Sequence, residues 1–331
     1  MQQSDFGFKR WVGNQLNTQD FTLVPLKGDA SFRSYYRATT ATQTYIVMWA
    51  PPPKEQTQPF VNIARGWQQS GLQVPTVWAW EPQQGFVLLS DFGDVLLEEA
   101  LSLETVDAYY HHAMQILLAL QLQTGLPAFN EAAIRLELSY FQEWFLAKFL
   151  KIEMSLEVME ILEPVFNHLF ASFTGQPQVA VHRDFHCRNL MVLDTGTLGI
   201  IDFQDAVTGP ITYDLVSLLK DCYIDWESAK VNHWVKIFYE MCLQEKRIPP
   251  IDYAQFLQWF DWVGLQRHLK VLGIFARLHL RDNKPQYLQY LPRIMNYVLQ
   301  VTQRYPEFYA LHQWLQAQVV TRVDLARGKV A

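Results

Sequence analysis

The sequence predicts an α+β protein with a small β-rich N-terminal lobe at residues 1–92 and a larger helical C-terminal lobe at residues 93–331. Two observations predict this class. Short segments rich in aromatic and β-branched residues end near residue 92, and long segments with the periodicity of helices follow them. Half of the 331 residues are hydrophobic and 14% are aromatic, so the chain can form a substantial core.

The N-terminal lobe is predicted from short candidate strands that Gly, Pro, Asp and Gln residues separate. The strands are expected at residues 21–26, 34–40, 44–50 and 85–92. One helix is expected among them at 59–72, because Phe60, Ile63, Ala64 and Trp67 recur at helical spacing. The Pro-rich segment 50–59 is interpreted as a loop and not as a linker between independent domains.

The C-terminal lobe is predicted to be helical almost throughout. Apolar residues recur with a helical period in six long segments, which lie at 103–124, 136–152, 155–173, 226–246, 252–283 and 286–304. The β-structure expected in this lobe lies within 181–206. No internal repeat or low-complexity tract is evident.

Charge and cysteine content exclude several classes of protein. The net charge of −6 and the isoelectric point near 5.8 give no electrostatic basis for binding nucleic acid or an anionic membrane. The three cysteines lack CxxC spacing, which argues against a disulfide framework or a zinc site. The N-terminus has no apolar core typical of a signal peptide, and no apolar stretch is long enough to span a bilayer. We therefore expect a cytoplasmic monomer.

The segment "VHRDFHCRNLMVLDTGTLGIIDFQDA" at 181–206 carries the strongest chemical signal. Two apolar runs flank "DTGT", which is typical of a tight turn, so the segment predicts a β-hairpin. Pairing the two strands brings Asn189, just before the first, beside Asp202, just after the second. An amide oxygen beside a carboxylate suits Mg²⁺, which takes its other ligands from water and phosphates. Asn189 and Asp202 are therefore the predicted metal ligands.

Asp184 is the predicted catalytic residue. It lies five residues before Asn189, on the loop that leads into the hairpin. A carboxylate there can accept the proton of an attacking hydroxyl and orient that hydroxyl toward phosphorus. The spacing of these polar residues around an apolar hairpin indicates phosphoryl transfer, whereas turn-forming polarity alone is the simpler alternative. His182 is expected to brace the loop, and Asp214 is expected to hydrogen-bond its backbone.

These motifs resemble a known family. "HRDFHCRN" and "IDFQDA" look like the catalytic loop and the metal-binding segment of the aminoglycoside phosphotransferase / kinase-like superfamily. The closer resemblance is to the bacterial N-acetylmuramate/N-acetylglucosamine anomeric sugar kinases. It extends to "GDASFRSYYR", "APPP", "FVLLSDFGD", "GPITYDLVSLLKDCY" and "GLQRHLKVLGIFARLHLRDNKPQYL". The resemblance implies a bilobal protein-kinase-like fold, the use of ATP and Mg²⁺, and an amino sugar as acceptor.

The expected ATP site departs from the wider kinase pattern. The segment in the place of the Gly-rich loop holds one glycine, Gly28, although backbone N–H groups near Gly28, Ala30 and Ser31 can still approach phosphates. Met48 stands where a strand lysine is expected. Since guanidinium binds phosphate bidentately, Arg33 is the favoured replacement, with Arg37 and Arg65 as alternatives. The helix 59–72 also lacks the glutamate that would pair with such a lysine.

The resemblance also indicates where adenine would bind. "FVLLSDFGD" resembles the hinge between kinase lobes, where the backbone around Leu89 and Asp91 would hydrogen-bond the base. A buried strand end explains the same apolar run equally well.

Four residues are candidates for contacts with the acceptor. Gln204 and Asp205 directly follow the metal-binding segment. Only nine residues separate Phe203 from the next helix, which leaves no platform for a peptide and favours a small acceptor. Arg267 and Lys270 lie on the basic face of the helix expected at 252–283, where solvation is the simplest interpretation. If that face borders the acceptor, it favours a neutral or anionic acceptor, such as N-acetylmuramate, which carries a lactyl carboxylate.

Two alternatives stay open. A kinase for another small alcohol, such as choline, homoserine or an aminoglycoside, shares the same motifs. A pseudokinase that acts as a binding or scaffold protein would account for Met48 and the missing glutamate, but the intact Asp184, Asn189 and Asp202 argue against it.

Overall fold

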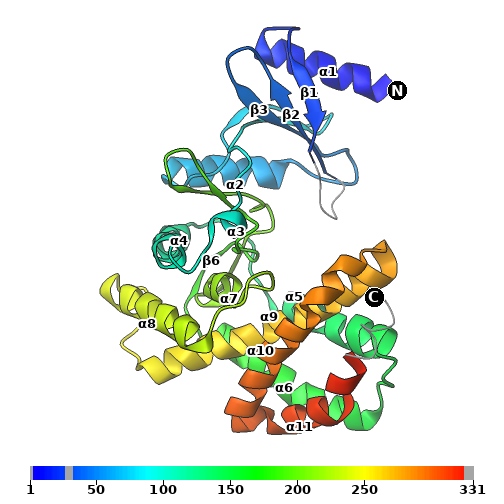
Figure 1. Ribbon diagram of the computed structural model, residues 1–331, viewed down its shortest axis with the longest axis vertical. Helices are drawn as coiled ribbons and strands as arrows, with labels where there is room; N and C mark the ends of the chain where they lie inside the picture. Colours follow the sequence, from blue (N-terminus) through cyan, green and yellow to red (C-terminus); the bar gives the residue numbers. More distant parts are fainter. Residues whose placement is uncertain (1–2, 27–32, 324–331) are drawn as a thin grey trace. The chain divides into compact units, whose positions relative to one another are not determined.

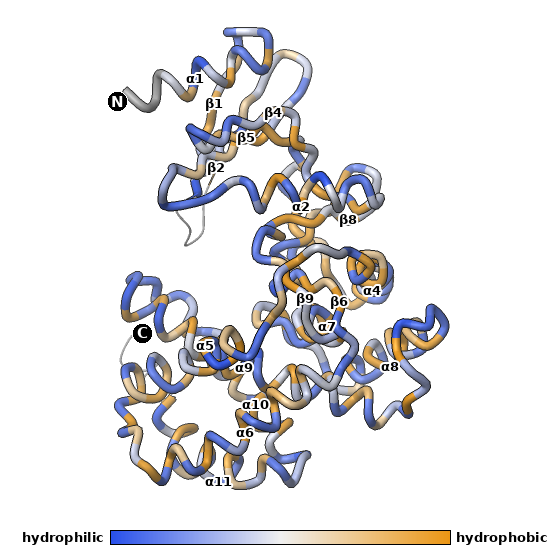
Figure 2. The backbone as a smooth tube through the Cα atoms, turned by 180° about the vertical axis from the view of Figure 1, so that it is seen from behind, coloured by the Kyte–Doolittle hydropathy of each residue, from blue (hydrophilic) through white to orange (hydrophobic). Residues whose placement is uncertain are grey.

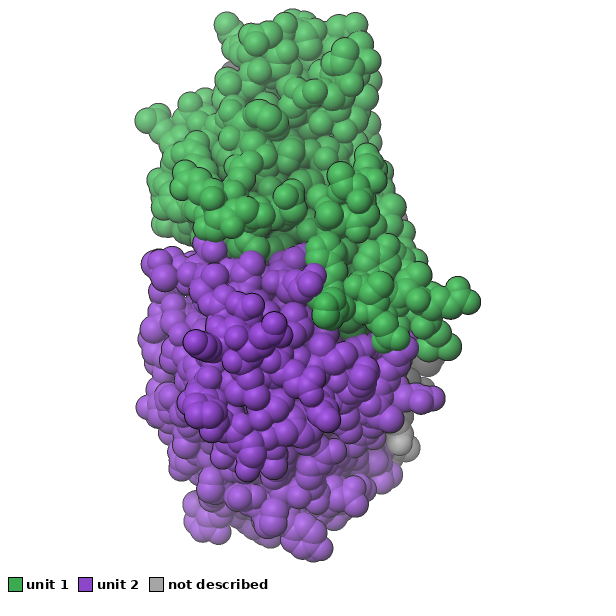
Figure 3. Space-filling model, turned by 90° about the vertical axis from the view of Figure 1, so that its left-hand side faces the viewer, with its two compact units in different colours: residues 1–112, 188–205 green, residues 113–187, 206–331 purple. Residues whose placement is uncertain are grey.

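The computed structural model describes residues 3–26 and 33–323 of the chain. The residues form two compact units. Unit 1 comprises residues 1–112 and 188–205, and unit 2 comprises residues 113–187 and 206–331 (Figure 3). The chain therefore leaves unit 1 after His112, returns at Arg188 and leaves again after Asp205. The sequence-based division at residue 92 assigns residues 188–205, which include the predicted metal ligands, to the C-terminal lobe, whereas in the structure they belong to unit 1.

Unit 1 is built on an antiparallel sheet of five strands in the order β1-β2-β3-β5-β4 (Figure 1). The strands are β1 (Thr22–Pro25), β2 (Ser34–Thr39), β3 (Thr44–Trp49), β4 (Val77–Glu81) and β5 (Phe86–Ser90). Four of them confirm the predicted strands. β4 was not predicted, and its register with β5 shifts between Val77 and Ala79. Gly85, at φ 72°, makes the β4–β5 turn, where a Cβ would meet the Ala50 carbonyl.

Helix α1 (Gln3–Leu16) packs on one face of this sheet and was missed by the sequence analysis. Its Phe8 ring lies 5.0 Å from that of Phe86 in β5, and Val12 is completely buried in the same cluster. Phe8 and Val12 lie four residues apart, which is the spacing of one helix face. The N-terminal segment therefore contributes to the core of unit 1.

The rest of unit 1 contains the predicted hairpin, which consists of β7 (Leu190–Val192) and β8 (Leu198–Ile200). It also contains α2 (Gln58–Gln69), the short α3 (Leu97–Ala100) and the start of α4 (Val106–Leu120). The predicted helix at 59–72 is confirmed as α2, which buries Phe60, Ala64 and Trp67.

Unit 2 is mainly helical, as predicted. Its helices after α4 are α5 (Glu131–Tyr140), the π-helix η1 (Phe141–Phe149), α6 (Leu156–Thr174), α7 (Tyr213–Leu219), α8 (Ser228–Gln244), α9 (Tyr253–Asp282), α10 (Leu291–Arg304) and α11 (Tyr309–Gln318), with 3₁₀ turns η2 (Pro285–Tyr290) and η3 (Pro306–Phe308). A short antiparallel pair, β6 (Gln178–Val181) and β9 (Val207–Pro210), was not predicted. Along α8 the colours of Figure 2 change repeatedly between hydrophobic and hydrophilic, as in an amphipathic helix.

The long helix α9 lies against α5 and η1 in the centre of unit 2. At Gly273, an added Cβ would lie 2.3 Å from the carbonyl carbon of Tyr140, where α5 passes into the π-helix. Only glycine allows this approach of two backbones. The contact fixes α9 at one level along α5, and this placement brings the side chains of α9 to the catalytic segment described below. In the described part of the chain, no helix is both long and apolar enough to cross a membrane.

Candidate active site

The hairpin in unit 1 has the predicted form. Leu190 pairs with Ile200 in an antiparallel register, and Gly196 makes the turn at φ 76°. Beyond the last pair, the Ile201 N–H donates to the Asn189 carbonyl over 3.1 Å. Asn189 and Asp202 therefore lie next to one another at the open end of the hairpin.

Asp202 has a backbone conformation that is unusual for a residue other than glycine, with φ at 63°. Its neighbour Phe203 is completely buried, and the Phe203 ring stacks on Phe60 of α2 at 4.9 Å. The left-handed turn thus separates a buried ring from a carboxylate on consecutive residues. Such a conformation in a polar residue is typical of a functional site.

Gln204 lies close to Asp202, since its Nε2 donates to Asp202 Oδ1 over 2.8 Å. Gln204 Oε1 is buried and has no hydrogen-bond donor in the structure. The Asp202 carboxylate, the Asn189 side chain and this amide oxygen form a set of hard oxygen donors, which is the chemistry that Mg²⁺ prefers. The residues present therefore fit a magnesium ion.

Arg33 belongs to a polar group in unit 1. Its guanidinium pairs with Glu55 over 3.2 Å. Burial would lower the pKa of Arg33, but Tyr35, Glu55 and Asp205 outweigh it and hold that pKa above its ordinary value. Burial, with Asp202 among the lesser causes, raises the pKa of Tyr35 to about 12, so its hydroxyl keeps its proton. Arg33 and Tyr35 are thus near the carboxylates that follow the hairpin.

The alternative phosphate ligands are engaged elsewhere. Arg37 pairs with Asp91 over 2.6 Å and with Asp94 over 2.7 Å. Arg65 is exposed and lies over the Trp80 ring at 5.8 Å. Met48 is completely buried, between Tyr35 and Val87 in the sheet register. Of the three arginines, Arg33 is the one whose surroundings include the carboxylates beyond the hairpin.

The other predicted nucleotide contacts are distributed as follows. Leu89 is paired with Ile46 inside the sheet, and the Asp91 side chain is held by Arg37. Gly28, Ala30 and Ser31 lie outside the described residues.

The segment that is predicted to be catalytic, residues 182–187, lies in unit 2 and follows β6 in the chain; we call it the catalytic segment. Buried Asp214, in the first turn of α7, accepts the N–H groups of His182 over 2.6 Å and Arg183 over 3.0 Å. Ser217, one turn further on, donates to the Arg183 carbonyl over 3.3 Å. Arg183 has φ at 79°, a conformation that these contacts hold in place. His182 Nδ1 accepts the Asp184 N–H over 3.3 Å, so His182 braces the loop.

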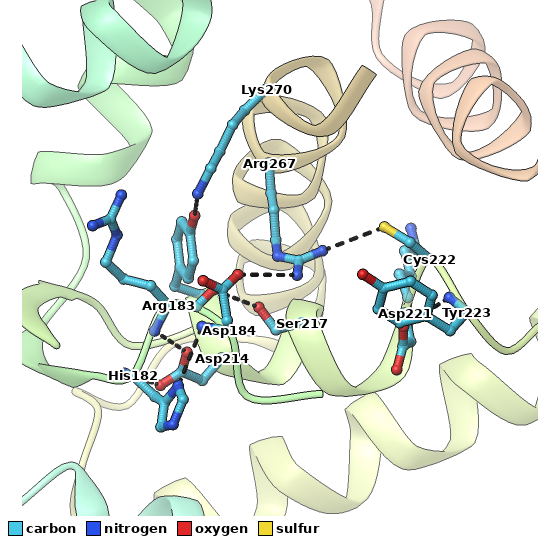
Figure 4. Close-up of polar contacts among 12 residues, drawn as sticks. His182, Arg183, Asp184, Asp214, Ser217, Asp221, Cys222, Tyr223, Arg267 and Lys270 are labelled. Atoms are coloured by element: carbon cyan, nitrogen blue, oxygen red, sulfur yellow. Dashed lines mark hydrogen bonds and ion pairs between the residues drawn. The ribbon is translucent and has the colours of Figure 1, made fainter. Parts of the chain in front are cut away.

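Asp184 faces positively charged side chains (Figure 4). Its Oδ1 lies 3.9 Å from an Arg267 nitrogen, and its side chain keeps 48% of its surface exposed, whereas that of Arg267 keeps 3%. Enclosure would raise the pKa of Asp184, but Lys270, His186 and Arg267 together hold that pKa far below its ordinary value. Asp184 is therefore a permanently ionised carboxylate that remains accessible to a ligand.

The expectation of a solvated basic face on α9 is wrong for Arg267 and Lys270, because both side chains are buried. Lys270 Nζ pairs with Glu137 over 3.1 Å and donates to the Tyr213 hydroxyl over 3.2 Å. Glu137 also pairs with Arg183 and accepts the Gln266 amide over 2.9 Å. Burial would raise the pKa of Glu137, but Lys270 and Arg183 hold it below its ordinary value. The buried Glu137 carboxylate thus compensates for the burial of Lys270 and pairs with Arg183.

Arg267 differs from Lys270 in its partners. Its guanidinium lies 3.9 Å from Asp184 and 3.8 Å from the Cys222 sulfur, and its Nε has no hydrogen-bond acceptor among the described residues. Burial raises the pKa of the Cys222 thiol to about 11, so the sulfur is a neutral and weak acceptor. A buried guanidinium with such weak partners can still donate hydrogen bonds to an anionic or hydroxyl-rich ligand near Asp184.

Two residues of these groups were not predicted from the sequence, Tyr35 and Glu137. Glu137 gave a usable signal, since it lies between Ile134 and Leu138 on the buried face of α5, where an acidic residue requires a partner. Tyr35 gave none, because an aromatic residue in a strand is expected for packing alone.

Together, the sheet-based unit, the helical unit and the Asp184, Asn189 and Asp202 pattern define a kinase-like phosphotransferase fold. Residues 22–246 match the model of the phosphotransferase enzyme family. The chain belongs to this family, as predicted.

Relatives and solved structures agree with this assignment. The chain is 38% identical over 296 residues to a Pseudomonas aeruginosa protein named N-acetylmuramate/N-acetylglucosamine kinase. The aligned region covers 88% of this chain and 87% of the relative. It is 36% identical over 334 residues to a Neisseria meningitidis protein of the same name, with 98% and 99% covered. Similar solved structures include choline kinase LicA from Streptococcus pneumoniae (TM-score 0.63, 12% identity, 90% of this chain and 100% of that chain). Another is ADP-bound aminoglycoside phosphotransferase APH(2'')-Ib (TM-score 0.59, 14% identity, 88% and 97%). The predicted fold class is therefore confirmed.

Proposed function

We propose that this phosphotransferase transfers the terminal phosphate of ATP to the anomeric hydroxyl of N-acetylmuramate or N-acetylglucosamine and releases the sugar 1-phosphate and ADP. The observation that carries the proposal is the accessible Asp184 carboxylate beside the buried Arg267 guanidinium. The names of the two relatives support the choice of sugar. The reaction would take place in the cytoplasm, where ATP is supplied.

Asp184 orients the acceptor in this proposal. Its carboxylate accepts a hydrogen bond from the sugar hydroxyl and directs the hydroxyl oxygen toward phosphorus. That oxygen forms the new P–O bond, and the bond between the terminal phosphorus and the bridging oxygen of ATP breaks as ADP leaves. Because its pKa is held low, Asp184 takes the proton only as the hydroxyl becomes strongly acidic in the course of bond formation.

The polar group of unit 1 serves the nucleotide. Asn189 and Asp202 would hold Mg²⁺, which supplies positive charge to neutralise the phosphates when bound. Arg33 binds a phosphate oxygen through its guanidinium. Gln204 keeps the Asp202 carboxylate oriented through its hydrogen bond. The charge of Asp205 favours the positively charged form of Arg33.

The surroundings of Asp184 disfavour a cationic acceptor such as choline or an aminoglycoside. Arg267 and Lys270 are buried cations close to Asp184, and like charges in a poorly solvated site repel strongly. A neutral sugar or one that carries a carboxylate meets no such penalty. The Arg267 guanidinium is suited to the lactyl carboxylate of N-acetylmuramate.

A panel of acceptors tests the proposal. ADP release is measured with N-acetylmuramate, N-acetylglucosamine, choline and an aminoglycoside, and the product is examined by phosphorus NMR. We expect release to rise with the two amino sugars and the product phosphorus to couple to the anomeric proton. Coupling to the C6 methylene protons would assign a different hydroxyl, and no acceptor-stimulated release would favour the pseudokinase alternative.

A further inference from the structure

Asp221 is a second buried carboxylate beside the catalytic segment, at the opposite end from Asp214. It lies two residues after the end of α7 and is 1% exposed. Its Oδ2 accepts the Cys187 N–H over 3.1 Å, and its Oδ1 accepts the Tyr223 N–H over 2.8 Å. Both oxygens therefore bind backbone amides.

The catalytic segment is bound at both of its ends. Asp214 accepts the first two amides of the segment, and Asp221 accepts the last one, that of Cys187. Asp214 belongs to α7 and Asp221 follows shortly after the end of this helix, so neighbouring parts of the chain hold the segment on either side of Asp184 (Figure 4). Hydrogen bonds from amides to an ionised carboxylate are among the stronger ones in proteins.

We propose that Asp221 is a positioning residue that fixes the end of the catalytic segment and joins it to the segment Cys222–Tyr223. This second connection reaches the acceptor side of the site, because the Cys222 sulfur contacts Arg267, which in turn lies beside Asp184. Asp221 thereby sets the position of Asp184 relative to Arg267. The kinetic consequence rests on the proposed function, whereas the structural role does not.

Loss of Asp221 would remove the carboxylate that accepts the last amide of the segment, without changing any residue that touches a substrate. A displacement of about 1 Å of a reacting group can lower turnover by roughly 10²-fold. A modest movement of residues 184–187 is therefore enough to impair catalysis.

Amide hydrogen exchange tests the structural role in the full-length protein. Asp221→Asn keeps the volume of the side chain but replaces one acceptor by a donor. Because one acceptor oxygen remains, we expect at least one of the two amides, that of Cys187 or that of Tyr223, to exchange about 10-fold faster or more. The amides of His182 and Arg183, which Asp214 binds, should keep their rates. Unchanged exchange at Cys187 and Tyr223 would overturn the proposal.

Kinetics and a matched variant separate positioning from loss of stability. Asp261→Asn alters an equally buried carboxylate of unit 2, whose partners Lys220, Arg304 and Tyr305 lie outside the catalytic segment. We expect Asp221→Asn to lower kcat by about 10-fold and to raise KM for the sugar, with KM for ATP unchanged. Asp261→Asn should lower the melting temperature and leave both KM values and the kcat of the folded protein intact.

The outcomes are distinguishable. If Asp221→Asn loses activity only in proportion to its folded fraction, as expected for Asp261→Asn, Asp221 has a structural role alone and the proposal is wrong. If the unaltered protein phosphorylates no amino sugar, the proposed function is wrong, and the exchange rates at Cys187 and Tyr223 alone decide whether Asp221 holds the segment.

Discussion

Asp184 in unit 2 and Asp202 in unit 1 are carboxylates eighteen residues apart whose surroundings differ in charge. Asp184 lies near the buried cations Arg267 and Lys270, whereas burial lowers the pKa of the neighbouring His186. Asp202 accepts a hydrogen bond from a neutral amide, that of Gln204. The first carboxylate has positive charges of the protein beside it, whereas in the proposed function the second would meet the cation that arrives with the nucleotide.

In the proposed function, the two carboxylates have different tasks. A carboxylate near fixed cations is favoured in its ionised form and can hold a hydroxyl in one orientation. A carboxylate beside an amide can bind a metal ion without first displacing a resident cation.

The largest effect is expected at Asp202. Asp202→Ala should abolish the Mg²⁺-dependent part of ATP binding, because it removes the charge that would meet the ion. Calorimetry of ATP binding with and without Mg²⁺ measures the effect. Asp194→Ala, an exposed position in the turn of the same hairpin, is the control and should bind normally. Unchanged Mg·ATP affinity in Asp202→Ala would reassign the metal site.

Asp184→Asn should lower kcat by at least about 10²-fold, the scale of a lost general base. ATP should still bind with its usual affinity, in contrast to Asp202→Ala. Steady-state kinetics and calorimetry on the same sample check both parts. Asp225→Asn, at an exposed position of unit 2, should retain its activity. Turnover near that of the unaltered protein would remove Asp184 from the mechanism.

The contrast also depends on Asp214, which holds the segment that carries Asp184. Burial, partly opposed by His182, raises the pKa of Asp214 from 3.8 to about 6. Because the folded state binds this proton more tightly, the stabilising contribution is present below pH 4 and is lost as the pH rises to about 6. The shift corresponds to about 3 kcal/mol.

Asp214→Asn does not titrate, so its unfolding free energy relative to the unaltered protein reports this group. We expect the unaltered protein to become less stable relative to Asp214→Asn between pH 4 and 6, and the difference to stay constant above that range. Denaturant unfolding at several pH values measures it. A difference that does not change with pH would show that the pKa of Asp214 is the same in the folded and unfolded states, and would contradict the shift.

Arg33→Ala should raise KM for ATP and lower kcat, each by about 10-fold, because a contact to phosphate persists in the transition state. Met48→Leu should affect packing alone, with a small loss of stability and ordinary kinetics, since Met48 is completely buried. Arg65→Ala is the matched arginine control. An indifferent Arg33 together with a kinetically critical position 48 would move the phosphate site to β3.

The smallest effect is a change of preference between two sugars. Arg267→Ala should impair N-acetylmuramate a few-fold more than N-acetylglucosamine, since only the former carries a carboxylate. Lys270→Ala should impair both equally, because Lys270 is paired with Glu137 in the core. The ratio of kcat/KM values for the two sugars is the measurement. Equal losses in Arg267→Ala would show that this guanidinium does not distinguish them.

The sequence predicted best what neighbouring residues decide. The hairpin of β7 and β8 follows from two apolar runs and a glycine turn within a few residues, and its pairing then brings Asn189 to Asp202. Long helices such as α9 follow from their periodicity. The four-residue strands β6 and β9 were missed because their pairing joins segments about 30 residues apart, beyond the range of any local pattern.

The burial of Lys270 could not be predicted from the sequence for a related reason. A lysine on a polar helix face is expected to be solvated, and only a distant partner reverses this expectation. That partner is Glu137, which lies 133 residues earlier in the chain. Helix α1 is a different case, because Phe8 and Val12 showed helical spacing and the polar residues around them obscured it.

The discontinuity of unit 1 affects how the protein is made. The N-terminal residues require partners synthesised much later, since Leu96 bridges to Met191 and the Gln73 carbonyl accepts the Ile200 N–H. At ordinary rates of translation, the stretch from residue 112 to residue 205 takes on the order of 5 to 20 s to emerge. During that interval the residues of the nascent chain that later contact the hairpin lack this partner. A gene fragment that ends at residue 112 would encode these residues permanently without it.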